Sequence, residues 1–282
     1  MNRLSIFVLL SGLLRLPELL AAPANVGVLA VADNPVRLMR ATSLYQAPAG
    51  TRLQATDFIE TDQSSAQIDE LAGIRVGMGP HTRIYLERSG TTTRIALLNG
   101  WLKLQPVPGV KAENLSIRTA TLELDASRSA SVIHAEGSRV EVFVEDGTQT
   151  LIERDDQGRD GRKTTLTQEQ YTHRNGLEQL REPGRPGSDF ISAMPPAFFD
   201  PLPSIAVKKL AAVPLVKVRD VTFDDVSPLL LGPFKPGMRT LATRFAPRLS
   251  DPAFRQAITQ RFGGTLEWET ELYRFERKTR VH

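Results

Sequence analysis

The sequence predicts a mainly β protein of short strands, followed by a proline-rich strap and a small α-helical C-terminal region. Three observations lead to this prediction. Short segments within residues 25–175 alternate apolar and polar side chains and end at Gly or Pro, which is typical of strands. Prolines then crowd residues 176–203. Capping signals for helices follow in residues 204–282.

Residues 1–24 have the pattern of a secretory signal peptide. Arg3 supplies the charged start, residues 5–14 form a short apolar core, and small residues surround a cut after Ala24. The apolar core has about ten residues, half of the roughly 20 that a membrane-spanning helix needs. No cysteine follows it, which excludes a lipoprotein anchor. We therefore expect an exported chain that is periplasmic or secreted after cleavage. An uncut membrane anchor and a buried core helix are the alternatives.

The pattern in residues 25–175 predicts many short strands and no helix between them. Strict alternation, as in residues 119–125 and 139–143, places one face of a strand on a core and the other in water. Such a series favours a sandwich, a barrel or a solenoid. The expected strands are residues 26–31, 36–40, 56–61, 66–76, 82–86, 92–98, 101–104, 115–119, 121–124, 131–134, 139–144 and 148–152.

Several motifs in residues 26–175 occur in the order found in FecR-like domains. Gly50, Leu53, Asp57, Ile59 and Thr61 match the opening pattern G..L..GD.I.T, in which Thr56 replaces the usual second Gly. Later segments that resemble the family's motifs are residues 74–76, 80–86, 95–102, 115–120, 140–147 and 165–170.

This resemblance implies a periplasmic β-rich domain with a twisted, solenoid-like or sandwich fold. In the family, such a domain often relays a signal from an outer-membrane receptor to an anti-sigma segment. No stretch of the chain after residue 24 reaches transmembrane length, and no anti-sigma segment is recognised. The expectation is therefore a free-standing exported module.

Residues 176–203 form the proline-rich strap. Proline fixes φ and removes a backbone donor, so regular structure is not expected here. Phe190, Phe198 and Phe199 lie between the prolines. Because large apolar groups favour burial, we expect the strap to pack onto the surface of a domain rather than to be a free linker.

Helix signals begin at Ser204, which is a candidate cap for a helix over residues 205–212. A second helix is predicted over residues 238–245, before Pro247. The clearest case starts at Asp251 and Pro252, an N-cap followed by proline at the first helical position. It shows Phe254, Ile258 and Phe262 on one face and ends at Gly263. These helices are expected to pair as a small hairpin. The side chains expected to pack the tail against it are Trp268, Leu272, Tyr273 and Phe275.

Basic residues are concentrated in the predicted helices. One interpretation is a solvated polar face. The other is a docking face for acidic partners or anionic envelope polymers, because arginine prefers carboxylate and phosphate. The residues concerned are Arg239, Arg244, Arg248, Arg255 and Arg261.

Composition excludes several classes of function. The 282 residues contain no cysteine and four histidines, so disulfides, thiolate metal sites and cysteine nucleophiles are excluded and a multi-histidine metal site is not expected. Lys and Arg (35) exceed Asp and Glu (32) by only 3, which does not indicate a nucleic-acid-binding protein.

No motif in the sequence indicates catalysis, a cofactor or a metal. Residues 77–82 begin like a dinucleotide loop, but Thr82 replaces the last Gly and no helix follows. Residues 156–161 have the spacing of half a calcium loop, with Thr167 where a Glu is needed. Ser131 and His134 are three apart in a strand and so point to opposite faces. His81, beside Pro80, is interpreted as a turn residue.

Two further sets of residues are candidate sites. Asp57 and Asp62 are a conceivable acid and base pair, but exposed carboxylates are common. Trp101 and Trp268 are conceivable sugar platforms, although an indole buries so much area that Trp101 is expected in the core.

The leading hypothesis is an exported, non-catalytic FecR-like module that binds another cell-envelope protein as a sensor or scaffold component. The alternative is a module that binds cell-wall glycan or polysaccharide, with Trp101, Tyr45 or Tyr85 as a stacking platform. A hydrolase with an unrecognised carboxylate pair ranks third.

Overall fold

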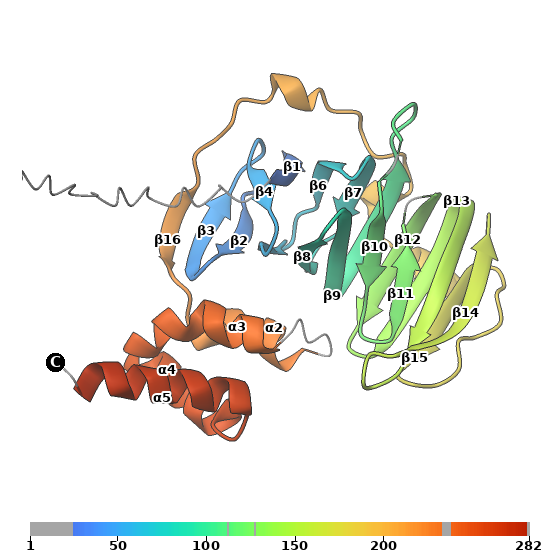
Figure 1. Ribbon diagram of the computed structural model, residues 1–282. Helices are drawn as coiled ribbons and strands as arrows, with labels where there is room; N and C mark the ends of the chain where they lie inside the picture. Colours follow the sequence, from blue (N-terminus) through green and yellow to red (C-terminus); the bar gives the residue numbers. More distant parts are fainter. Residues whose placement is uncertain (1–24, 112, 127, 233–237, 281–282) are drawn as a thin grey trace, which may run out of the picture.

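The computed structural model describes residues 25–111, 113–126, 128–232 and 238–280, and the predicted signal peptide lies outside these ranges. The strands within them join into one hydrogen-bonded sheet (Figure 1). The strands are β1 (Asn25–Ala32), β2 (Val36–Arg40), β3 (Ser43–Ala47), β4 (Arg52–Gln54), β5 (Phe58–Glu60), β6 (Ala66–Leu71), β7 (Ile74–Met78), β8 (Arg83–Ser89), β9 (Thr92–Pro106), β10 (Leu115–Arg118), β11 (Leu122–Asp125), β12 (Ser129–Glu136), β13 (Arg139–Arg154), β14 (Asp160–Thr167), β15 (Tyr171–Asn175) and β16 (Val216–Asp220).

The helices lie in the strap and in the C-terminal region. They are α1 (Ser188–Ala193), α2 (Phe223–Leu231), α3 (Met238–Phe245), α4 (Pro252–Phe262) and α5 (Leu266–Arg280). Within the described ranges, none of them is long and apolar enough to cross a membrane.

The two longest strands each pass through both layers of the sheet. The first part of β9 pairs with β8 and β10, and its second part pairs with β7 and β12. In the same way, β13 pairs first with β12 and β15 and then with β11 and β14. The partners change at Gly100 and Gly147, where φ is +95° and +82°. Glycine adopts this conformation without the steric cost of a Cβ, so both residues form corners between the layers.

The main core lies between the two layers. Leu38, Ile59 and Ile84 enter it from one layer, and Leu104 and Ile133 enter it from the other. All five side chains are fully buried. β10 pairs with both β9 and β11, which helps to curl the sheet onto itself. The described strands confirm a mainly β fold and form a curled, two-layer sheet. They do not show the solenoid that the resemblance also implied.

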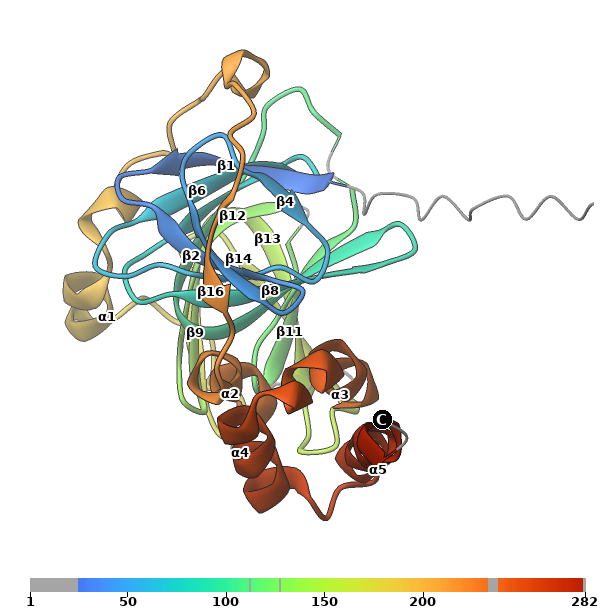
Figure 2. The same ribbon diagram turned by 90° about the vertical axis from the view of Figure 1, so that its left-hand side faces the viewer.

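Helices α2–α5 cover the outer face of the layer that contains β2, β3, β5 and β8 (Figure 2). Met39, Phe58 and Tyr85 project from this layer into a second core, whose largest buried side chain is Trp268 of α5. The predicted helices over residues 238–245 and 252–262 are confirmed. The Asp251 side chain caps α4 by accepting hydrogen bonds from the next backbone N–H groups, as expected.

The strap covers the outer face of the opposite layer. Phe190, Met194 and Phe198 are buried against Trp101 and Val132. Further polar contacts hold the strap in place: the Lys103 ammonium donates to the Phe198 carbonyl at 2.6 Å, and Leu202 N–H donates to the Gln105 side chain at 2.7 Å. The expectation that the strap packs onto a domain surface is confirmed.

Several predicted boundaries are wrong. The predicted strand over residues 66–76 is a hairpin, because Ala72 and Gly73 have positive φ and separate β6 from β7. The segments over residues 92–98 and 101–104 are one strand. Five of the described strands were not predicted from the sequence: β3, β4, β14, β15 and β16.

The helix predicted over residues 205–212 is also wrong. Only a single 3₁₀ turn forms at Val207–Lys209, and the chain then runs extended into β16. Pro214 disfavours helical geometry at the residue before it. The valine-rich segment that follows pairs with the edge of β3 instead, so part of the predicted helical region joins the sheet.

Three of the five arginines in the helical region are used inside the molecule. Arg244 donates to the carbonyl groups of Ala41 and Thr56 at 3.0 and 2.7 Å. Arg248 donates to the Val221 carbonyl, and Arg255 lies 5.0 Å above the ring of Phe275. Neither a solvated face nor a docking face describes these three residues. Arg261 is exposed, and the side chain of Arg239 lies outside the described part.

Arg244→Met is expected to lower the free energy of unfolding by about 2–3 kcal/mol, because two turn carbonyls lose a charged donor. Ala41 and Thr56 both have positive φ, so these turns have few other ways to satisfy their carbonyl groups. Urea unfolding followed by tryptophan fluorescence measures the change. Arg261→Met, at an exposed position of α4, is the control and should change stability by less than about 0.5 kcal/mol. Equal effects of the two variants would contradict this role of Arg244.

Candidate functional site

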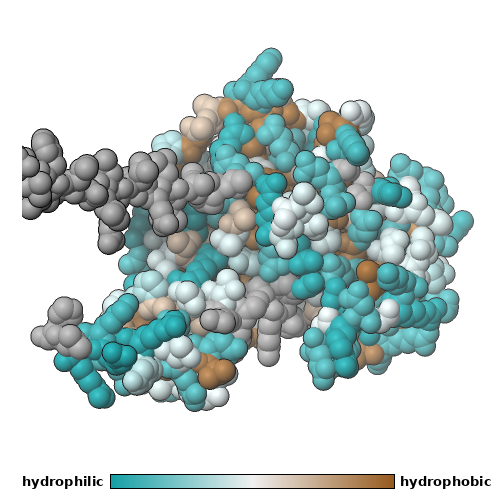
Figure 3. All heavy atoms as spheres, in the orientation of Figure 1, coloured by the Kyte–Doolittle hydropathy of each residue, from teal (hydrophilic) through white to brown (hydrophobic). Residues whose placement is uncertain are grey.

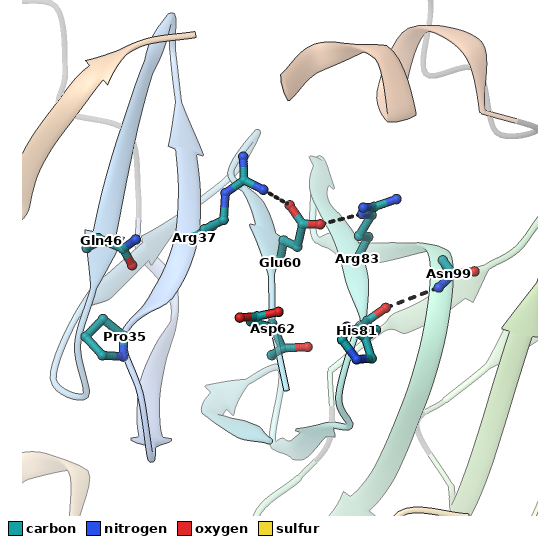
Figure 4. Close-up of a pocket in the computed structure, with 9 residues that line it drawn as sticks. Pro35, Arg37, Gln46, Glu60, Asp62, His81, Arg83 and Asn99 are labelled. Atoms are coloured by element: carbon teal, nitrogen blue, oxygen red, sulfur yellow. Dashed lines mark hydrogen bonds and ion pairs between the residues drawn. The ribbon is translucent and has the colours of Figure 1, made fainter. Parts of the chain in front are cut away.

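A row of polar side chains crosses the outer face of five adjacent strands. The strand register places Arg37 of β2 opposite both Gln46 of β3 and Glu60 of β5. It also places Arg83 of β8 opposite both Glu60 and Asn99 of β9. Residues directly opposite each other in a sheet project from the same face, so these five side chains form one row (Figure 4). We call it the polar row.

The polar row is open because the helical layer covers only the neighbouring row. In β2, β5 and β8, the residue next to the polar row faces the main core. The residues one step further on, Met39, Phe58 and Tyr85, face the helices and are buried. The period of two along each strand therefore separates a helix-covered apolar row from an uncovered polar row on the same face.

Opposite charges alternate along the polar row and continue into α2. Glu60 accepts from Arg83 Nε at 2.6 Å and from Arg37 Nη1 at 2.9 Å. Arg37 Nη2 donates to Asp225 at 2.8 Å, and Arg219 of β16 also pairs with Asp225. Three guanidinium groups and two carboxylates leave one positive charge in this chain of ion pairs. We call it the charge chain.

Asp225 connects the charge chain to the start of α2. Its carboxylate accepts from the backbone N–H of Thr222 at 2.7 Å and completes a capping box with that residue. Burial raises the pKa of Asp225, but hydrogen bonds from Arg219 and Thr222 outweigh burial and lower the pKa to about 2. The carboxylate is therefore charged at neutral pH and fixes the first turn of α2 beside the polar row.

The polar row forms the floor of a recess of about 420 Å³. Asp62 and His81 lie at one end of this recess (Figure 4). His81 has a φ of +52°, its N–H donates to the Asp62 carbonyl, and its own carbonyl accepts from the Asn99 side chain at 3.1 Å. The turn at His81 that the sequence predicted is confirmed, and it lies at the site rather than away from it.

A second recess of about 700 Å³ adjoins the first and shares His81 and Asn99 with it. Its walls are mostly apolar and come from β9, β12 and the strap. Trp101 stacks on His134 with ring centroids 4.0 Å apart, and the strap contributes Phe199, whose exposed fraction is 55%. We call the two recesses together the groove. On the face of the molecule that Figure 3 shows, hydrophilic side chains predominate and apolar patches are scattered among them.

A hydrogen-bonded group beneath α1 supports the apolar end of the groove. Glu141 accepts from Arg139 at 2.9 Å and from the Tyr171 hydroxyl at 2.6 Å, and it lies 2.9 Å from His134 Nδ1. Burial raises the pKa of Glu141, but these hydrogen bonds outweigh burial and lower the pKa to about 2. Phe190 of α1 packs on Tyr171 and Trp101, so this group determines where the strap rests.

Stability at acid pH is expected to depend on Glu141. Because folding lowers its pKa from 4.5 to about 2, its contribution is present above pH 4.5 and is lost as the pH falls toward 2. Glu141→Gln should therefore lower the free energy of unfolding at pH 7 by about 1–2 kcal/mol, a value that allows for partial solvent screening. The free energy of unfolding of this variant should also fall less steeply as the pH is lowered. Chemical unfolding at a series of pH values measures both quantities. The control is Glu136→Gln, at an exposed position of the neighbouring strand. If the free energy of unfolding fell equally steeply with pH in wild type and in Glu141→Gln, the prediction would be contradicted.

The rejected motifs have structural roles. Gly77 and Gly79 allow the strap to approach the sheet closely. A Cβ on Gly77 would lie 2.9 Å from the Leu202 side chain, and a Cβ on Gly79 would lie 2.9 Å from the Pro195 side chain. The polar turn between β13 and β14 is closed by Asp155, which accepts from Arg159. Among the described residues, no group of His, Asp and Glu side chains has the geometry of a metal site.

The candidate catalytic pairs do not come together. The buried Ser131 hydroxyl donates to Gln149, whereas His134 contacts Glu141. Asp57 is fully buried and paired with Arg40 at 2.7 Å, whereas Asp62 is exposed in the groove.

The aromatic candidates are mostly internal. Trp101, Tyr85 and Trp268 have exposed fractions of 8%, 3% and 0%. Tyr45 is partly buried against the main core. The core position expected for Trp101 is confirmed, although its ring also borders the groove.

Comparison with known proteins gives a partial structural similarity only. No family model and no curated protein matches the chain. Two crystal structures of a putative anti-sigma factor from Parabacteroides distasonis, at 2.50 and 1.65 Å resolution, are similar to it with a TM-score of 0.39 and 13% identity. The alignments cover 48% of this chain and 62% and 63% of those chains, which is less than two thirds of their length.

Proposed function

We propose that the chain is an exported, non-catalytic, FecR-like module that binds another protein of the cell envelope as a sensor or scaffold component, and that the groove is its contact site. The observation that carries this proposal is the junction of a charged recess and an apolar recess at His81 and Asn99. Protein interfaces combine these features, with apolar anchors at the centre and fixed polar groups around them.

The residue types in the groove also favour a protein partner. Arginine, tryptophan, phenylalanine and methionine are enriched in protein interfaces, and lysine is depleted. Arg37, Arg83 and Phe199 line the groove with accessible side chains, which are 39%, 41% and 55% exposed. The sheet fixes the strands that carry the polar row, and ion pairs hold Arg37 and Arg83 in place. Binding of a partner would therefore cost little conformational entropy for these two side chains.

The two other hypotheses have less support. A glycan platform needs exposed, flat aromatic surfaces, whereas the named tryptophan and tyrosine side chains are buried or packed on the core. A carboxylate hydrolase needs two available acids in one cleft, and Asp57 is buried in an ion pair outside the groove. Glu60 lines the charged recess together with Asp62, but its carboxylate is engaged by Arg37 and Arg83.

Affinity capture from the envelope fraction of the producing cells tests the proposal. The wild-type chain should retain a specific protein, and a variant that combines Arg83→Gln with Phe199→Ser should retain much less of it. The control combines Arg88→Gln with Leu177→Ser, because Arg88 is exposed on the same strand as Arg83 and Leu177 is 57% exposed outside the groove. Recovery of peptidoglycan or polysaccharide without any protein would overturn the proposal.

A further inference from the structure

We infer that the groove recognises an extended segment of its partner in which a carboxylate side chain lies a few residues from a bulky apolar side chain. This inference rests on the proposed function and specifies the chemistry of the partner. It follows from three features of the groove: a guanidinium group whose two terminal nitrogens have no partner among the described residues, an apolar recess beside it, and amide side chains along the floor.

The charge chain ends in the groove at Arg83. The Nε of Arg83 is bound to Glu60, but its two terminal nitrogens have no partner among the described residues, and its side chain is 41% exposed. Arg37 has both terminal nitrogens engaged, by Glu60 and Asp225. Arg83 is therefore the guanidinium that can bind a further carboxylate, and its bond to Glu60 holds it in position.

Asp62 restricts where that carboxylate can bind. It is exposed at the His81 end of the charged recess, and like charges repel at short range (Figure 4). A ligand carboxylate should therefore bind toward Arg83 and away from Asp62. This gives a signed prediction: removal of the Asp62 charge should strengthen binding, which loss of a purely structural residue would not do.

The adjoining recess fits an apolar side chain. Ile191, Met194 and Phe199 from the strap line it together with Trp101. An exposed phenylalanine beside an apolar hollow is a common anchor in protein interfaces, because covering it removes a large apolar area from water. Phe199 also lines the next recess along the strap, which Arg128, Glu145 and Asp146 line as well.

The floor of the groove suits an extended backbone. Gln46 and Asn99 lie at the two ends of the polar row and carry amide groups, which both donate and accept hydrogen bonds. Asn99 lies where the two recesses meet. A segment that crosses this junction would place neighbouring side chains in different recesses, with its peptide groups near Asn99.

Fluorescence anisotropy with synthetic peptides tests the inference. The probes are capped, fluorescein-labelled peptides of about nine residues, a length typical of extended recognition segments, with Glu and Phe at different short spacings in a Gly/Ser background. Sister peptides carry Gln for Glu or Ala for Phe. At least one spacing should bind, and its Gln and Ala sisters should bind about tenfold and about fivefold more weakly.

Variants of the full chain assign each effect to a residue. Arg83→Gln should weaken the Glu peptide about tenfold and leave the Gln peptide unchanged. Phe199→Ser should remove the preference for Phe, and Asp62→Asn should strengthen the Glu peptide about threefold. Arg88→Gln and Leu177→Ser, outside the groove, should change nothing.

Equal binding of the Glu and Gln peptides, or full binding by Arg83→Gln, would overturn the inference. The inference would also be overturned if no peptide bound while affinity capture still retained a protein through the groove. In that case the proposed function would stand and only the stated partner chemistry would be wrong. Failure of affinity capture itself would overturn the proposed function. Binding of cell-wall oligosaccharides in place of the peptides would also contradict both.

Discussion

Asp225→Ala is expected to lower the free energy of unfolding by about 2–4 kcal/mol, because it removes charged hydrogen bonds and a helix cap together. The Asp225 side chain is 5% exposed and is paired with Arg37 and Arg219. Its loss leaves two arginines facing each other and removes the capping box of α2. Urea unfolding of the purified chain measures the loss.

The neighbouring Asp224 provides a matched control. It is also an acid in the first turn of α2, but it is exposed. Asp224→Ala should remove only a favourable interaction with the helix dipole, about 0.5 kcal/mol. If Asp225→Ala were no more destabilising than Asp224→Ala, the charge chain would not anchor the helical layer.

Gly100→Ala is expected to destabilise the fold by about 3 kcal/mol or more, since it adds a steric clash to an unfavourable backbone conformation. A Cβ at this corner would lie 2.5 Å from the Cα of Thr82. Thr82 is fully buried and its hydroxyl accepts a hydrogen bond from Trp101 N–H. Because Asn99 and Trp101 flank Gly100, the clash should also distort the junction of the two recesses and weaken peptide binding.

Gly90→Ala separates the two contributions. Gly90 also has a positive φ, of +59°, but a Cβ there would meet nothing within 4 Å. It should lose only the backbone contribution, about 1 kcal/mol. Thermal or urea unfolding compares the two variants, and losses of equal size would show that close packing at Gly100 does not hold the corner.

Local patterns were sufficient to predict much of the fold. Alternating side chains revealed most strands around the main core, and the pair Asp251 and Pro252 marked the start of α4 correctly. Capping and alternation act over a few residues, so they can be read from the sequence. The valines of β16 carried a strand signal as well, but its partner β3 lies about 170 residues earlier and the pairing is a tertiary effect.

The groove could not be predicted because its residues meet through strand register. Arg37, Glu60 and Arg83 each lie two positions from a large apolar residue that faces the helices, so a pattern was present in each strand. Alone, each reads as an ordinary exposed charge. Only the pairing of β2, β5 and β8 places them side by side. The arginines of the helices show the converse: their concentration suggested a surface, whereas Arg244 binds turn carbonyls within the fold.

Photo-crosslinking in the envelope of the producing cells tests most directly whether the groove contacts a protein. A photoreactive residue at Asn99, where the two recesses meet, should give a discrete crosslink to a single protein. The matched position is Lys163, which is exposed on β14 at the far end of the sheet (Figure 1). The crosslink should disappear with Arg83→Gln and Phe199→Ser together and should be absent from Lys163. Equal crosslinking from both positions, or none from Asn99, would contradict the assignment of the groove as a protein-binding site.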